Sequence, residues 1–175
     1  MITFKKITSY ATLLLVTTLM SGNAMATDVL VHLWDKGKDA MAHADMTKPM
    51  GMAMPGAGDM SKATMGITVD SNDIHAGEVT LVAINDSKVL VHEMLIVPVL
   101  STYSPLPYDN QKMRVDEDAA HSLGEVSELD PGQTGALRLN LKPGTYVLLC
   151  NVPGHYAMGM WTTIVVKPKV NANDS

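Results

Sequence analysis

One short stretch near the C-terminus holds a cysteine, a histidine and a methionine in the spacing Cys150-x4-His155-x4-Met160. A thiolate and a thioether are soft ligands and an imidazole is a borderline one, so this set suits copper. Pro153 and Gly154 lie between the first two residues and predict a chain reversal that turns His155 back toward Cys150. We therefore expect these side chains to share one metal ion.

Cys150 is the only cysteine of the chain, so no internal disulfide can form. A buried apolar cysteine is the alternative to a ligand, and the neighbouring His155 and Met160 favour the ligand. A cysteine hydrolase is disfavoured because its Cys and His normally come from distant parts of a chain and need a third orienting group. No His-x-His motif of a multicopper oxidase occurs. We expect a protein that is not an enzyme.

A second histidine ligand is predicted at His92, inside the apolar run 89–97. A polar ring there needs a partner, which is either a backbone carbonyl of the core or a metal. The cysteine motif favours the metal. Two histidines and a thiolate in a plane, with a long axial bond to Met160, define a type 1 copper site. Met158 is a minor alternative for the axial position, because it would need a tighter loop.

From residue 67 onward, short β-branched runs alternate with Pro-Gly turns, which is typical of a β-sandwich and not of βαβ units. Residues 100–124 interrupt the pattern, and we expect a surface loop with a short helical turn there. The expected strands are 29–34, 67–69, 79–85, 90–97, 125–129, 136–141, 145–150 and 161–166.

Residues 1–26 resemble a cleaved secretion signal. Lys5 and Lys6 precede the apolar run 11–20, and 24–26 fits a small-x-small cleavage site. A membrane-spanning helix is the alternative, but the run falls short of about 20 apolar residues. We expect a periplasmic protein of about 150 residues that starts at Thr27, with one domain and no membrane association.

The charge of the chain restricts its partners. The net charge is −5, and loss of the two signal lysines makes it more negative still. This balance argues against nucleic acid and anionic lipid. We expect a monomer whose partners are copper ions and a periplasmic redox or copper-transfer protein.

Residues 35–62 are rich in methionine, with Gly, Pro, Asp and Lys interrupting every helical or strand face. Thioethers prefer Cu(I), so this segment is predicted to capture additional copper, although methionine as adaptable apolar filler is the alternative. His32, His75 and His121 show no ligand spacing and are expected at the surface. The methionines are Met41, Met46, Met50, Met52, Met54 and Met60, with His43 nearby.

The stretches 150–160, 91–94 and 141–146 resemble the plastocyanin and azurin superfamily, the cupredoxins. Residues 33–37 and 124–132 are similar to the periplasmic cupredoxins of bacterial copper tolerance. This resemblance implies an all-β Greek-key sandwich with one copper at its end. It also implies His92, Cys150, His155 and Met160 as its ligands. The expected division is 1–26 signal, 27–66 N-terminal strand and flexible methionine-rich segment, 67–170 cupredoxin domain and 171–175 tail.

Two positions depart from the family. Azurin-type loops place the methionine one residue earlier, at Gly159 here, so the spacing is similar to rusticyanin-like and sulfocyanin-like members. Glu93 follows the first histidine where many members have Asn or Ser, which leaves the family's hydrogen bond from that position unsupported by the sequence. The expected function is copper handling and tolerance. The alternative is a mobile one-electron carrier that uses an exposed edge of His155.

Overall fold

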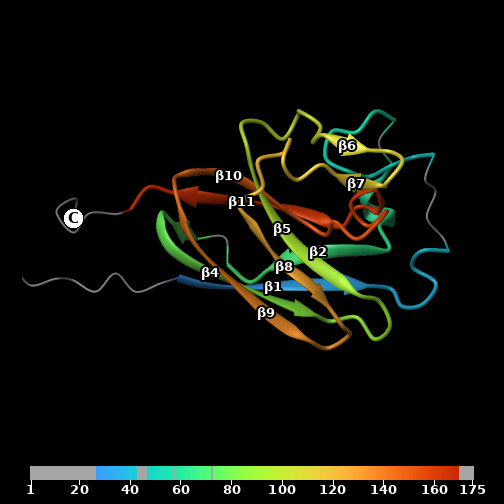
Figure 1. Ribbon diagram of the computed structural model, residues 1–175, viewed down its shortest axis with the longest axis horizontal. Helices are drawn as coiled ribbons and strands as arrows, with labels where there is room; N and C mark the ends of the chain where they lie inside the picture. Colours follow the sequence, from blue (N-terminus) through green and yellow to red (C-terminus); the bar gives the residue numbers. More distant parts are fainter. Residues whose placement is uncertain (1–26, 43–46, 57, 72, 170–175) are drawn as a thin grey trace, which may run out of the picture.

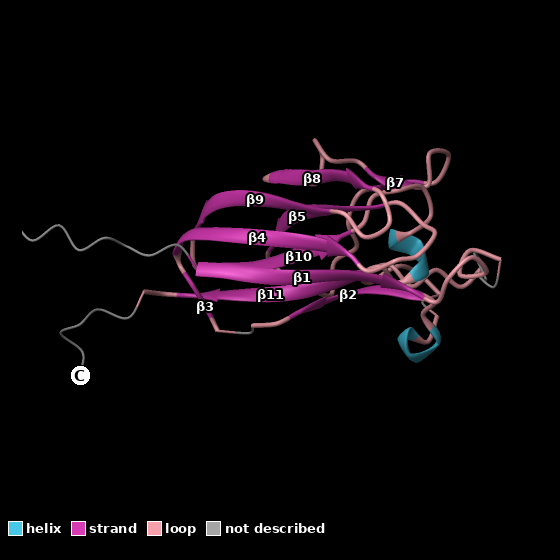
Figure 2. Cartoon of the chain, turned by 90° about the horizontal axis from the view of Figure 1, so that it is seen from below, coloured by secondary structure: helices cyan, strands magenta, loops and turns pink. Residues whose placement is uncertain are grey.

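The computed structural model describes residues 27–42, 47–56, 58–71 and 73–169, so the expected signal and C-terminal tail lie outside the described residues. Two sheets pack face to face as a sandwich (Figures 1 and 2), which confirms the all-β expectation. One sheet has the order β2-β1-β4-β9 and the other β3-β11-β10-β5-β8. The strands are β1 (Thr27–Asp35), β2 (Met65–Val69), β3 (Ile74–His75), β4 (Gly77–Asn85), β5 (His92–Val99), β8 (Gly124–Leu129), β9 (Thr134–Leu141), β10 (Gly144–Leu149) and β11 (Trp161–Lys167).

The core between the two sheets is formed by every second residue of the strands, because buried and exposed side chains alternate along them. In β4, Val79, Leu81 and Ala83 are fully buried while the residues between them are not, as expected for a strand with one face on the core. β1 has the same pattern and runs parallel to β4, with Thr27 opposite Val79. β1 is thus an inner strand of its sheet. This strand of the sandwich precedes residue 67, the expected start of the cupredoxin domain.

β5 is buried on both of its faces. Met94 and Ile96 face the core between the sheets, whereas Leu95 and Val97 belong to a second apolar cluster on the outer side of the five-stranded sheet. This explains why the strand reads as an unbroken apolar run and not as an alternation. Two segments outside the sandwich cover this outer face, and they contribute Met52, Met54, Leu106, Val115 and Ala120.

The insertion between residues 100 and 124 is one of these two covers. It contains a hairpin of β6 (Tyr108–Asp109) and β7 (Arg114–Val115), which the sequence did not predict because each strand has only two residues. The expected helical turn follows the hairpin, where the Ala120 N–H donates to the Asp116 carbonyl and the Ser122 N–H to the Glu117 carbonyl, each over 2.9 Å. The insertion is therefore a packed part of the molecule as well as a surface loop.

The loops gather at one end of the sandwich (Figure 2), where both short 3-10 helices lie, η1 (Met60–Lys62) and η2 (Tyr156–Met158). Neither of these helices, the only ones within the described ranges, is long or apolar enough to cross a bilayer. Strands β5 and β10, which are neighbours in the five-stranded sheet, bring residues 92 and 150 to this end. The candidate ligands are thus delivered by paired strands.

Gly135 of β9 tests the packing between the sheets. A Cβ atom at this position would overlap the Val126 side chain of β8. We expect Gly135→Ala to lower the free energy of unfolding by about 1–3 kcal/mol, the usual cost of overpacking. Gly144→Ala is the control, because its nearest neighbour would be 3.8 Å away. Urea denaturation of both variants measures the difference, and equal losses would contradict the close approach of β8 and β9.

Candidate metal centre

His92 is the first residue of β5 and lies beside a bulge in the neighbouring strand β8. The pairing of β5 with β8 shifts register here, because His92 pairs with Leu129 but Met94 pairs with Val126, so the extra residue lies in β8, opposite Glu93. Bulges beside functional sites re-aim side chains. Opposite this bulge, His92, Glu93 and Met94 are all buried, and the backbone N–H of Glu93 donates to the Cys150 sulfur over 3.4 Å. The backbone N–H of Glu93 thus donates to the cysteine. The sequence had left a hydrogen bond from the side chain at this position unsupported, because Glu93 replaces the Asn or Ser of many family members.

Cys150 follows the last residue of β10, and its N–H donates to the Met160 carbonyl over 3.0 Å. This bond extends the antiparallel ladder in which Leu149 lies opposite Trp161. Residues directly opposite each other in such a ladder project to the same face of the sheet. Cys150 and Met160 therefore project to the same side, and both are fully buried.

The loop between them is shaped by two glycines and held from outside. Gly154 and Gly159 have φ values of 86° and 94°, a left-handed region that favours glycine. The Gly154 N–H donates to the Met113 carbonyl of the insertion over 2.8 Å. The Asn151 side chain exchanges two hydrogen bonds with the backbone of Val115, at 2.7 and 3.0 Å. The hairpin of β6 and β7 thus fixes the loop, a role that no spacing in the sequence indicates.

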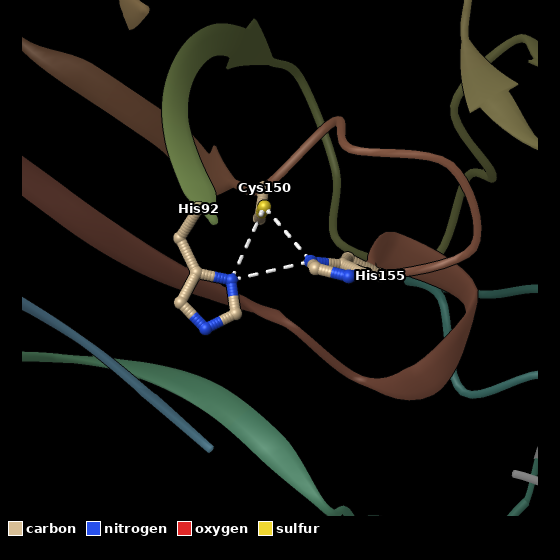
Figure 3. A group of neighbouring side chains, drawn as sticks. All are labelled: His92, Cys150 and His155. Carbon is tan, nitrogen blue, oxygen red and sulfur yellow. Dashed lines mark hydrogen bonds between the residues drawn. The ribbon is translucent and has the colours of Figure 1, made fainter. Parts of the chain in front are cut away.

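Three donor atoms of the predicted set converge (Figure 3). The two Nδ1 atoms of His92 and His155 are 3.2 Å apart, and the Cys150 sulfur lies 3.9 Å from the first and 3.3 Å from the second. All three residues are buried. Bonds of about 2.0–2.3 Å from a central metal place the corners of a triangle about 3.5–4 Å apart. The spacing and the chemistry of this donor set fit one copper ion.

The two axial candidates differ in their position. Met160 lies opposite Cys150 in the ladder, whereas Met158 is in η2 and its N–H donates to the Gly154 carbonyl. Both side chains are buried in the same core cluster as Cys150. The ladder position favours Met160 as the residue whose thioether shares the site with the thiolate.

Burial sets the protonation of the donors. It raises the pKa of the Cys150 thiol to about 12, although hydrogen bonds from Glu93 and Val152 act in the opposite direction. Burial also lowers the pKa of His155 to about 4, and the nearby His92 adds to this effect. The metal-free site at neutral pH therefore holds a thiol and a neutral imidazole at these two positions. A metal has to displace the thiol proton when it binds.

Asp35, at the end of β1, is the main site residue that the ligand spacing did not reveal. Its Oδ2 lies 2.8 Å from the Nε2 atom of His92, and its side chain is 1% exposed. Burial alone would raise the pKa of Asp35, but hydrogen bonds from Ser87, His92 and Gly37 lower it below its usual value. The pKa of His92 is lowered by burial, which Asp35 opposes. The pair thus places a carboxylate against the Nε2 atom of the His92 imidazole.

Glu93 is a buried carboxyl without such partners. It is 4% exposed, and its Oε1 has no hydrogen-bond partner. Burial raises its pKa to about 7, which Arg114 opposes and Glu125, Glu128 and Glu117 reinforce. The sequence analysis did not identify Glu93 as a buried carboxyl. The signal that could have revealed it is a charged residue inside the apolar run 89–97.

The expectation that His155 presents an exposed edge is wrong. The residue is 3% exposed, and the whole loop from 154 to 160 is buried. The methionine-rich segment explains this, because it packs on the loop. The Met50 N–H donates to the Ala157 carbonyl over 2.6 Å, and the Trp161 indole donates to the Met50 carbonyl over 2.6 Å.

The methionines of this segment divide into two groups. Met52 and Met54 are core residues of the second cluster beside Tyr156, as in the apolar-filler alternative, whereas Met41 and Met60 are 41% and 43% exposed. Met46 and His43 lie outside the described residues. The other three histidines are at the surface as expected, with His32 and His75 partly exposed and His121 exposed.

Comparisons with known proteins show the family and the fold of the chain. Residues 73–174 match the family model described as the sulfocyanin (SoxE) domain. Auracyanin-B of Chloroflexus aurantiacus is 36% identical over 52 residues, which are 29% of this chain and 22% of that protein. The chain thus spans about a fifth of the length of this relative. A rusticyanin structure shares 21% identity at a TM-score of 0.50, with 84% of this chain and 79% of that one covered, which supports the fold. An auracyanin of Roseiflexus castenholzii covers 84% and 100% of the two chains at 18% identity and a TM-score of 0.42.

Glu93 predicts a pH-dependent stability. The pKa of Glu93 is about 7 in the folded protein and 4.5 for an ordinary glutamate. Between pH 4.5 and pH 7 the folded state therefore keeps a proton that the unfolded state has lost. The free energy of unfolding should fall as pH rises through this window. The decrease should be complete above pH 7 and amount to about 3 kcal/mol at most. Glu93→Gln removes this loss and should be more stable than wild type at about pH 8, but not at about pH 4.

Denaturant unfolding of the copper-free protein at several pH values measures this effect. Glu78→Gln is the matched control, because Glu78 is an exposed strand residue. If wild type, Glu93→Gln and Glu78→Gln share one pH profile, the buried carboxyl does not titrate as described.

Proposed function

Because the chain belongs to the sulfocyanin (SoxE) family, and is thus a cupredoxin with copper as its cofactor, we propose that it handles copper in the periplasm and contributes to copper tolerance. The proposal includes export through the signal at residues 1–26 and no catalytic activity. The packing of the methionine-rich segment on the copper-binding loop is the observation that supports it best. The proposed ligands are His92, Cys150, His155 and Met160.

In this proposal the two Nδ1 atoms, the Cys150 thiolate and the Met160 thioether would hold the copper ion, with the thioether as the weakest of the four donors. Bound copper would supply a one-electron change between Cu(II) and Cu(I). The chain holds the donors in place. The pairing with Leu129 of β8 places His92, the ladder bond places Met160 beside Cys150, and the Glu93 N–H stabilises the thiolate charge.

The surroundings of the loop favour copper handling. Exposed thioethers flank it at two points, because the Met41 methyl lies near Gly154 and the Met60 sulfur near Gly159. These glycines adjoin two of the proposed ligands, His155 and Met160. Thioethers bind Cu(I) in preference to harder cations. We propose that Met41, Met50 and Met60 capture Cu(I) at the surface next to the type 1 site.

The second candidate function is a mobile one-electron carrier. A groove beside η2 favours it, because the groove borders the copper-binding loop at Ala157 and has a mainly apolar lining that suits a transient protein partner. A carrier that transfers electrons through a ligand edge presents that edge to its partner, whereas His155 is 3% exposed. We therefore place copper handling first. The other lining residues include Pro49, Pro55, Pro105, Leu106 and Tyr108.

An optical spectrum tests the ligand set. Copper-loaded, oxidised protein should show an intense visible band from thiolate-to-copper charge transfer, and Cys150→Ser should abolish it because only the thiolate gives this transition. Met160→Leu should shift the band and the reduction potential while copper stays bound, since the axial bond is long and weak. Met158→Leu is the matched control. A shift with Met158→Leu and none with Met160→Leu would show that the axial assignment is wrong.

Copper capture by the segment has a separate test. Replacement of Met41, Met50 and Met60 by Leu should keep the visible band and lower the number of Cu(I) equivalents bound under reducing conditions. Leucine retains size and apolarity, so a packing role survives. Met52→Leu with Met54→Leu is the control, because both side chains are buried and should leave the Cu(I) stoichiometry unchanged.

Growth of cells that produce these variants separates the two functions. Copper handling predicts poorer growth at raised copper for the triple methionine variant and for Cys150→Ser, with little change in respiration at ordinary copper. Electron carriage predicts the reverse, with impaired respiration for Cys150→Ser and no effect of the methionine changes. Unchanged Cu(I) stoichiometry together with normal copper tolerance would refute copper handling.

A further inference from the structure

The carboxylate of Asp35 belongs to a different strand and a different sheet from the histidine that it contacts. Asp35 ends β1 and His92 begins β5, and the Oδ2 to Nε2 distance is 2.8 Å. The two side chains are 1% and 0% exposed. The contacted nitrogen is the one that faces away from the donor triangle, because Nδ1 is the atom near His155 and Cys150.

Further hydrogen bonds hold the Asp35 carboxylate in this position. Its Oδ1 accepts the Gly37 N–H over 2.6 Å, and the Ser87 side chain adds a further hydrogen bond. The nearby Glu93 carboxyl, in contrast, has an oxygen without a partner. A buried carboxylate with several donors retains its charge, whereas one without donors favours the neutral form. Asp35 is therefore a carboxylate anion beside the imidazole of His92.

We propose that Asp35 is a positioning residue of the copper site, which holds the His92 proton on Nε2, turns Nδ1 toward the metal and favours Cu(II) over Cu(I). This inference rests on the proposed ligation by His92. A neutral imidazole has one N–H, and a strong acceptor at Nε2 leaves Nδ1 as the free lone pair. The acceptor also makes the imidazole a more basic ligand.

The preference for the higher oxidation state follows from charge. A buried anion within one imidazole ring of the metal interacts more favourably with a divalent than with a monovalent ion. Low exposure leaves little water to screen the interaction. Removal of the charge should therefore weaken Cu(II) binding more than Cu(I) binding, and it should raise the reduction potential.

The variant Asp35→Asn retains an acceptor oxygen and removes the charge. Partners behind a metal-binding histidine typically contribute ten- to a hundredfold to metal affinity. We expect Asp35→Asn to retain the visible band and to bind Cu(II) about tenfold more weakly relative to Cu(I), which corresponds to a rise in potential of about 59 mV for one electron. Asp35→Ala, which lacks the acceptor, should in addition perturb the band.

The chain offers a matched control in His32 and Asp86. Their Nδ1 to Oδ2 distance is also 2.8 Å, but the side chains are 37% and 44% exposed, and among the described residues they belong to no cluster of metal donors. Asp86→Asn should leave the potential unchanged. Spectroelectrochemical titration of the copper-loaded protein measures all three variants. If Asp35→Asn and Asp35→Ala reduce thermal stability but leave the potential at the wild-type value, Asp35 is only structural and the proposal is wrong.

A measurement without copper keeps this inference separate from the proposed ligation. Nitrogen NMR of the copper-free wild-type protein reports which ring nitrogen of His92 carries the proton, and it also serves if Asp35→Asn fails to fold. A proton on Nε2 supports the proposal, and a neutral ring with its proton on Nδ1 overturns it. Failure of the proposed ligation would appear differently, as a wild-type protein without the thiolate-to-copper band.

Discussion

The backbone hydrogen bond from Cys150 to the Met160 carbonyl closes the loop on which the whole site depends. It is the last bond of the ladder between β10 and β11, so the rigidity of two central strands extends to the loop. Within the closed loop, positive φ at Gly154 and Gly159 sets the path of the chain. His155 can then point back to the cysteine. A pre-formed loop of this kind spares the metal the entropic cost of ordering its own ligands.

The site is covered by a second layer. The methionine-rich segment and the insertion that carries β6 and β7 both pack on the outer face of the five-stranded sheet, and both also contact the copper-binding loop. The same contacts that bury Leu95 and Val97 therefore hold the loop from outside. Water is kept from the donors, which strengthens the electrostatic interactions among them. The role of the insertion, which the sequence left open, is explained by these contacts.

Local patterns in the sequence were sufficient for much of this structure. Every long strand was predicted, because β-branched runs and Pro-Gly turns are local signals. The convergence of His92 with the cysteine loop was predicted from residue types. The buried state of His155 and the partnership of Asp35 with His92 were not, because both depend on segments that pack from far along the chain. The short strands β3, β6 and β7 were missed because they have only two residues each.

The parallel pairing of β1 with β4 has a consequence for the order of folding. Thr27 lies opposite Val79, so the strand that carries Asp35 cannot join its sheet until a distant part of the chain is in place. Pairings across long sequence separations pay loop-closure entropy before they gain contacts, and they form slowly. Asp35 can reach His92 only after this step. The surroundings of the first histidine are therefore complete only when β1 has paired within the sandwich.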